Sequence, residues 1–201
     1  MDFKQRVRNS IVDGAAIYKA VFLDYEYLIY SPEFSNRPYY IVSANADNYA
    51  HLTGVHSLLS AQDFFIACYN GTIRDSDFDF KKGRKSEASI IGTVRKKIAS
   101  LPFLSSLFVS KLHAEENFSK GHIHCLIAAT DTKITLGFVN AKFAIPQTLL
   151  KGNQVDNTKA VDITLVLRRD KGSEEFDTVI QGDPGDMLSL LNKLMNQKKD
   201  G

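Results

Sequence analysis

Apolar residues follow two different spacings along this chain, and the order of those spacings limits the fold. In residues 2–30 the apolar side chains recur at helical spacing. They are Phe3, Val7, Ile11, Ala15, Tyr18, Phe22 and Tyr25. Helical patterns return at 60–69 and 88–100, whereas the patterns after residue 121 are typical of strands. Helices that come first and strands that come later favour an α+β fold over a doubly wound sheet.

Short runs of β-prone residues define the expected strands. They are 39–43, 122–129, 134–139, 161–168 and 176–180, the last two forming a hairpin around 170–173. Alternation within the second run would bury one face, made of Ile123, Cys125, Ile127 and Ala129. Residues 72–87 are polar and predict an exposed loop. Asp183 and Pro184 then predict the start of a short final helix.

The composition is that of an ordinary globular protein, with 201 residues, 44% hydrophobic and 24% charged. A net charge of +2 means that any nucleic-acid binding must come from a local patch. Cys68 and Cys125 sit in apolar runs and are interpreted as buried small side chains rather than a disulfide. No apolar run is long enough for a membrane span, and the first residues lack a signal core, so we expect a cytoplasmic protein.

The stretch from Asn48 to Val55 carries the strongest candidate for chemistry. His51 has a side chain that can act as acid or base near neutral pH. Thr53 can share its site, and Gly54 allows the backbone to approach a ligand closely. The alternative is structural: His51 caps a turn and Thr53 bonds the local backbone.

Two clusters of cations are candidates for phosphate contacts. They are Lys81, Lys82, Arg84 and Lys85, followed by Arg95, Lys96 and Lys97. Asp75, Asp77 and Asp79 precede them and partly cancel their field. The alternative interpretation is a solvated surface.

Other motifs point away from metal and nucleotide chemistry. His122 and His124 would share one face of a strand, but no third ligand follows, so we interpret them as polar residues on an open sheet face. Thr148 follows Pro146 near a strand end and matters only if the fold brings it beside His51. Gly-rich phosphate loops, zinc patterns and Gly-x-Ser-x-Gly elbows are absent from the sequence. We therefore predict no metal and no cofactor.

Four segments in order resemble the fourth group of phage Barnase–EndoU–colicin–RelE-like nucleases. They are His51–Val55, Phe64-Phe65 through Asn70-Gly71-Thr72, Leu136–Phe138 and Pro146–Leu150, within roughly 39–180. The resemblance implies helices packed on a twisted antiparallel sheet and metal-independent RNase activity in phages and other mobile elements. It divides the chain into a long helix in 1–35, a nuclease-like domain in 36–182, and a helix and tail in 183–201. The family's segment Pro-Asn-Thr-Leu-Leu has Gln147 here in place of Asn.

The resemblance also implies roles for individual residues in attack by a ribose 2′-hydroxyl. His51 would act as general base or acid. Thr53 and Thr148 would donate hydrogen bonds to phosphate oxygens. Tyr49 would stack on a base. The cation that steadies the phosphate would be one of Lys82, Arg84 and Lys85.

Two other functions stay open, and so does the oligomeric state. A non-catalytic protein of a mobile element could use the same fold to inhibit a host defence factor or a toxin, with residues 2–30 as a docking element. A nucleic-acid-binding module without turnover would bind RNA with steep salt dependence.

Overall fold

A strongly curled sheet dominates the computed structural model, which describes residues 2–81, 83–84, 86–183, 185–187 and 189–190. Within this part of the chain the sheet has nine strands in the order β11-β5-β8-β9-β10-β2-β1-β12-β13. They span Val161–Asp162, His113–Glu116, Ile127–Thr130, Ile134–Asn140, Ala144–Lys151, Tyr39–Val42, Tyr25–Tyr30, Leu165–Asp170 and Thr178–Gly182. All neighbours are antiparallel except β2 and β10. The expected α+β fold is confirmed, with one parallel pair in the sheet.

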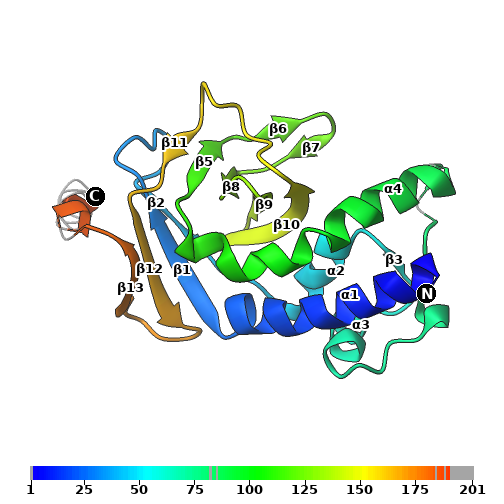
Figure 1. Ribbon diagram of the computed structural model, residues 1–201. Helices are drawn as coiled ribbons and strands as arrows, with labels where there is room; N and C mark the ends of the chain where they lie inside the picture. Colours follow the sequence, from blue (N-terminus) through cyan, green and yellow to red (C-terminus); the bar gives the residue numbers. More distant parts are fainter. Residues whose placement is uncertain (1, 82, 85, 184, 188, 191–201) are drawn as a thin grey trace.

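Helices gather on one side of this sheet (Figure 1). They are α1 (Phe3–Tyr18), η1 (Lys19–Leu23), η2 (Ala46–Asn48), α2 (Tyr49–Thr53), α3 (Ala61–Tyr69), η3 (Asp75–Asp77), α4 (Glu87–Ile98) and η4 (Leu101–Val109). Two small antiparallel ribbons pair β3 (His56–Ser57) with β4 (Phe78–Asp79), and β6 (Ser119–Lys120) with β7 (Ile123–His124). The β3–β4 ribbon lies among the helices, and the β6–β7 ribbon lies beyond the sheet.

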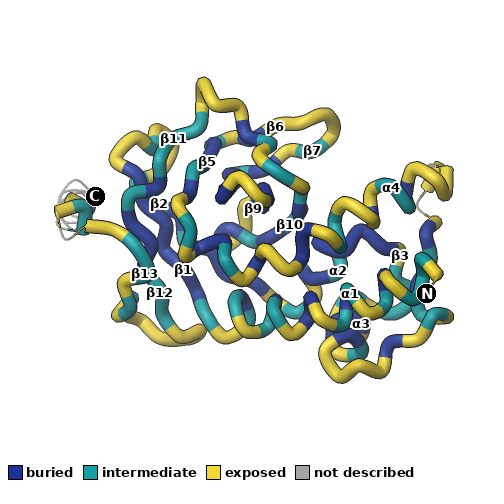
Figure 2. Tube along the Cα trace, viewed as in Figure 1, coloured by how far each residue is buried: buried dark blue, intermediate teal, exposed yellow. Residues whose placement is uncertain are grey.

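The sheet curls until its edges are bridged by a single connection. Residues 163–164 join β11 at one edge directly to β12 near the other. Ile163 N donates to Leu112 O and Thr164 N donates to Tyr30 O, each at 3.0 Å. The inner face of the sheet is therefore enclosed, and β1 within it is buried over most of its length (Figure 2).

One large apolar core fills the inside of the curl and continues beneath α1, α3 and η4. Its members include Ile11, Tyr18, Phe64, Leu104, Phe138 and Leu149. Two smaller clusters cover the outer face, because alternate residues of a strand point to opposite sides. One contains Leu28, Tyr30, Leu165, Leu167 and Leu190, and the other contains Phe118, Cys125, Ala128 and Val155.

The helix expected over residues 2–30 is too long. Asp2 caps α1 by accepting from Gln5 N at 2.8 Å, and a π-helical turn ends at Leu23. The following Tyr-Glu-Tyr-Leu-Ile-Tyr segment forms β1, paired on both sides inside the sheet. Its aromatic and β-branched residues favour a strand once two neighbours are available. Residues 1–35 thus supply a helix and a strand to the common core.

The strand expected over 122–129 is broken in two. Cys125 N donates to Phe118 O, and Leu126 N donates to Phe138 O, so the chain leaves β7 and enters β8. The break changes which face alternate residues occupy. Cys125 belongs to an outer cluster, whereas Ile127 and Ala129 lie in the inner core. The expectation that they share one face is wrong.

The other expected elements are confirmed within a few residues. They are β2, α3, α4, β9 and the β12–β13 hairpin. The first strand of that hairpin begins only at Leu165, because Val161 and Asp162 form the separate strand β11, which pairs with β5. Ser60 caps α3 by accepting from Asp63 N at 3.1 Å. The expected loop 72–87 also contains η3 and β4, and it buries Phe78 and Phe80.

Three further points concern the ends of the chain and the cysteines. In the final helix Asp183 Oδ1 accepts from Gly185 N at 2.6 Å, while Pro184 lies outside the described residues. Both cysteines are buried as expected, and burial raises the pKa of the Cys68 thiol to about 12. No helix in the described part of the chain is long and apolar enough to cross a membrane.

Candidate functional site around helix α2

Helix α2 places His51 on the surface. The chain leaves β2, and Asn45 and Asn48 bond each other's backbone around η2 before α2 begins. Tyr49 and Leu52 point into the core, which leaves His51 exposed on the opposite side of this short helix. α2 packs against β10, α3 and α4, and these contacts fix the backbone that carries His51.

Tyr49 and Thr53 serve the fold rather than a substrate. Tyr49 is fully buried, packs between Tyr18 and Phe65, and donates to Ile11 O at 2.6 Å. Its ring offers no face to a base, which corrects the expected stacking role. Thr53 is also fully buried, and its hydroxyl donates to Ala50 O at 2.9 Å. A hydroxyl has one proton to donate, so the expected hydrogen bond to a phosphate is not available in this structure. The structure thus agrees with the alternative in which Thr53 bonds the local backbone.

Lys97 of α4 reaches the segment that carries His51. Its Nζ donates to the carbonyl oxygen of His51 at 2.5 Å. Gly54, which ends α2 with a φ of +78°, lies beneath the Lys97 side chain. The positive φ favours glycine, and a Cβ at Gly54 would stand 2.7 Å from Lys97 Cδ, so a larger residue would also displace the Lys97 side chain. The cationic run of α4 is therefore anchored beside His51.

We expect Gly54→Ala to destabilise the protein by about 1–2 kcal/mol, because a side chain at positive φ is strained. Lys97 must also move away from the His51 carbonyl. Urea unfolding measures the loss. Gly71→Ala is the matched control, because Gly71 has a φ of +68° but nothing within 4 Å of its Cβ position. Equal losses in the two variants would show that the Lys97 contact adds nothing.

A second imidazole lies just beyond the Gly54 turn. His56 of β3 pairs with Asp79 of β4, and its Nδ1 lies 2.9 Å from Asp79 Oδ1. Lys81 N donates to the same carboxylate oxygen at 2.9 Å, and this bond foremost holds the pKa of Asp79 below its usual value. The ionised carboxylate favours a proton on Nδ1, which leaves Nε2 of a neutral His56 as the acceptor. The side chain of His56 is about half exposed, with 48% of its surface open.

Sequence patterns do not indicate His56 and Asp79 as site residues, because 23 positions separate them and the small β3–β4 ribbon brings them together. Lys97 belongs to a cluster of cations that the sequence offers for phosphate contacts, but its bond to the His51 carbonyl is visible only in the structure. Of the expected phosphate-binding cations, Arg84 is exposed on the segment before α4, and Lys82 and Lys85 lie outside the described residues.

Thr148 lies on β10, the strand against which α2 packs. It is only 7% exposed. It pairs with Gly137 after a bulge at Gln147, on the outer face of the sheet. A Cβ at Gly137 would stand 2.9 Å from Thr148 Cγ2 and 2.6 Å from Cys125 Sγ, so this glycine permits close packing there. The fold therefore brings the two backbone segments together while it nearly encloses the Thr148 side chain.

The remaining histidines lie elsewhere. His113 pairs with Asp162 at 2.7 Å between edge strands β5 and β11. His124 contacts Ser119 Oγ at 3.1 Å on the β6–β7 ribbon, and His122 is exposed beside it. Among the described residues no three His, Cys, Asp or Glu side chains form a group that could hold a metal ion.

Comparison with known proteins identifies one family. The family model described as phage-Barnase-EndoU-ColicinE5/D-RelE like nuclease 4 matches residues 10–183. The match begins inside α1 and ends after β13, so it includes the second half of the first helix, which the resemblance left out. No curated protein and no solved structure matches the chain.

Proposed function

Because this chain belongs to the phage Barnase–EndoU–ColicinE5/D–RelE-like nuclease 4 family, we propose that it is a metal-independent endoribonuclease of a phage or mobile element. One observation supports the proposal independently of the family match. Two exposed imidazoles, His51 and His56, flank the Gly54 turn, with Asp79 bonded to one and Lys97 anchored beside the other. Cleavage by a 2′-hydroxyl needs one group that takes a proton and one that gives a proton, and two imidazoles can supply both.

In this mechanism His56 is the base and His51 is the acid. Nε2 of His56 takes the proton of the 2′-hydroxyl, and the 2′-oxygen forms a bond to phosphorus. The bond from phosphorus to the 5′-oxygen breaks as His51 gives that oxygen a proton. The products are a 2′,3′-cyclic phosphate and a 5′-hydroxyl end. Asp79 and Lys97 are positioning residues, and Lys81 and Arg84 contribute positive charge near the phosphate.

A cleavage assay in the presence of a chelator tests the proposal. The purified protein is incubated with end-labelled single-stranded RNA and EDTA, and the products are resolved on a gel. We expect fragments that carry a 2′,3′-cyclic phosphate. Intact RNA bound in a salt-dependent way would instead support a binding module without turnover. The absence of both cleavage and RNA binding would favour the protein inhibitor.

The role of the Thr148 hydroxyl stays a prediction, and a pair of variants tests it. Thr148→Val removes the hydroxyl but nearly keeps the shape, whereas Thr148→Ser keeps the hydroxyl. If the hydroxyl donates to a phosphate oxygen, Thr148→Val should lose about 10- to 100-fold in kcat/KM, because a hydrogen bond to a charged group contributes roughly 1.5–3 kcal/mol. Thr148→Ser should retain most of the activity. Wild-type activity in Thr148→Val would leave Thr148 as a packing residue.

A further inference from the structure

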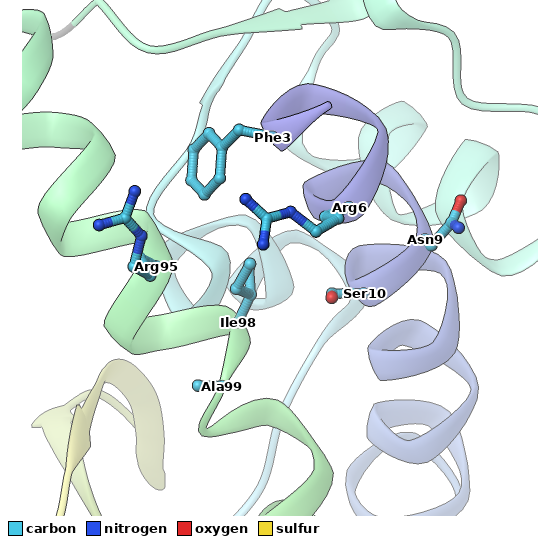
Figure 3. Close-up of a pocket in the computed structure, with 7 residues that line it drawn as sticks. All are labelled: Phe3, Arg6, Asn9, Ser10, Arg95, Ile98 and Ala99. Carbon is cyan, nitrogen blue, oxygen red and sulfur yellow. The ribbon is translucent and has the colours of Figure 1, made fainter. Parts of the chain in front are cut away.

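Helices α1 and α4 enclose a groove of about 420 Å³ that lies outside the His51 segment. It is lined by Phe3, Arg6, Asn9, Ser10, Arg95, Ile98 and Ala99. Figure 3 shows side chains from both helices around this space, with Phe3 at one end and Ala99 at the other. Its walls carry two guanidinium groups and no carboxylate.

The two arginines converge on one aromatic ring. Arg6 Cζ lies 5.7 Å from the centroid of Phe3, and Arg95 Cζ lies 5.3 Å from the same centroid. Stacking on a ring holds each guanidinium in place and leaves its N–H groups at the edge available. Both arginines are exposed, and neither forms an ion pair with a carboxylate of the described residues.

Two other charged residues of the α1 region, Arg8 and Asp2, are already bonded. Arg8, two residues after Arg6, pairs with Asp75 at 3.3 Å on another side of α1. Asp2, the acidic residue at the start of α1, caps the helix through Gln5 N. Two like charges held close together favour binding of an anion between them. A phosphate diester suits the site, because planar guanidinium groups donate paired hydrogen bonds to phosphate oxygens.

The groove and the proposed cleavage site lie on opposite flanks of α4. Arg95 faces α1, while Lys97 reaches the His51 carbonyl on the other flank of the same helix. Side chains two positions apart on a helix, such as Arg95 and Lys97, point about 200° apart around its axis. Lys96, which lies between them, is exposed. The three cations thus follow one another around a helix about 10 Å wide. An RNA strand seated at His51 can cross α4 and place another phosphate in the groove.

We propose that the α1–α4 groove is a phosphate-binding subsite for single-stranded RNA, away from the bond that is cut. This inference rests on the proposed nuclease function for the identity of the strand. The subsite requires Arg6 and Arg95 together, since each contributes one side of the charged cradle.

Binding of a non-cleavable RNA tests the subsite separately from catalysis. A labelled single-stranded RNA with 2′-O-methyl groups lacks the nucleophile, and fluorescence anisotropy gives its Kd at several salt concentrations. We expect the double variant Arg6→Gln/Arg95→Gln to bind about tenfold or more weakly. Its plot of log K against log salt should be shallower by about 0.7 for each lost phosphate contact. Arg8→Gln, at the paired arginine of the same helix, is the matched control and should bind as wild type.

The outcomes separate the subsite from the nuclease proposal. Unchanged affinity and salt slope in the folded double variant would overturn the subsite, even if the wild-type protein cleaves RNA. Equal losses in Arg8→Gln and the double variant would also overturn it, because they would indicate a general effect of charge. Weaker binding in the double variant, with wild-type binding in Arg8→Gln, supports the subsite. If the wild-type protein also fails to cleave RNA, the catalytic proposal fails while the subsite stands.

Discussion

Replacing His51 by glutamine should lower the single-turnover rate of RNA cleavage by about 10²–10⁴-fold, the range for loss of one general acid or base. The ring is exposed, so its removal leaves no cavity and the thermal unfolding temperature should stay close to that of the wild type. The bond from Lys97 goes to the backbone carbonyl of His51 and therefore survives the substitution. Quenched-flow cleavage of labelled RNA and thermal melting measure the two quantities.

The matched control for His51 is another exposed histidine. His122→Gln alters the same kind of side chain on the segment between β6 and β7, outside the proposed site. It should cleave RNA at the wild-type rate. A His51→Gln protein that is folded and equally fast would remove His51 from the mechanism and leave the acid unassigned.

Local signals in the sequence predicted the elements that depend on local contacts. The Ser60 hydroxyl and the Asp63 amide are three residues apart, and that spacing is visible in the sequence. The β12–β13 hairpin likewise needs only a short turn. Residues 25–30 were assigned to a helix because Tyr25 continues its spacing, yet the segment has strand partners at residues 39–42 and 165–170. Such distant partners override a local pattern.

The faces of strands were harder to predict than the strands themselves. A shift of one residue exchanges the inner and outer faces of everything that follows in the strand. This happens at Cys125, where β7 gives way to β8, and again at the bulge of Gln147 before Thr148. Pro146 stands directly before the second break, and a proline within a central strand is typical of a bulge. The sequence places Thr148 only near the end of a strand, whereas the structure places it within β10.

The catalytic role of His51 stays a prediction, but the residues that surround it differ from those that the sequence suggests. His51 is exposed on a short helix, as a catalytic role requires. Its neighbours in the sequence, Tyr49 and Thr53, are buried because a five-residue helix at a surface must turn part of its circumference inward. The residues that do accompany His51 come from other elements. Lys97 arrives with α4, and His56 gains its carboxylate through pairing with Asp79.

His56→Gln should cause a second loss of about 10²–10⁴-fold, because the proposed base is removed. Asp79→Asn should cause a smaller loss, since it keeps the imidazole and removes only the charge that orients it. The pKa of the Asp79 carboxyl is held below its usual value, foremost by Lys81 N. The carboxylate thus stays ionised above that lowered pKa, and its contact with His56 is lost only as the pH falls through it. Within the neutral range the wild-type protein keeps an oriented base.

The pair formed by His113 and Asp162 is the matched control for this prediction. It has the same chemistry, with 2.7 Å between Nδ1 and the carboxylate oxygen, but lies at the edge strands β5 and β11. Asp162→Asn should leave the cleavage rate unchanged. If Asp162→Asn and Asp79→Asn lose activity equally, the losses report general electrostatics rather than orientation of a base. If His56→Gln cleaves as fast as the wild type, the 2′-hydroxyl loses its proton to another group. His51 would then be the only imidazole left in the mechanism.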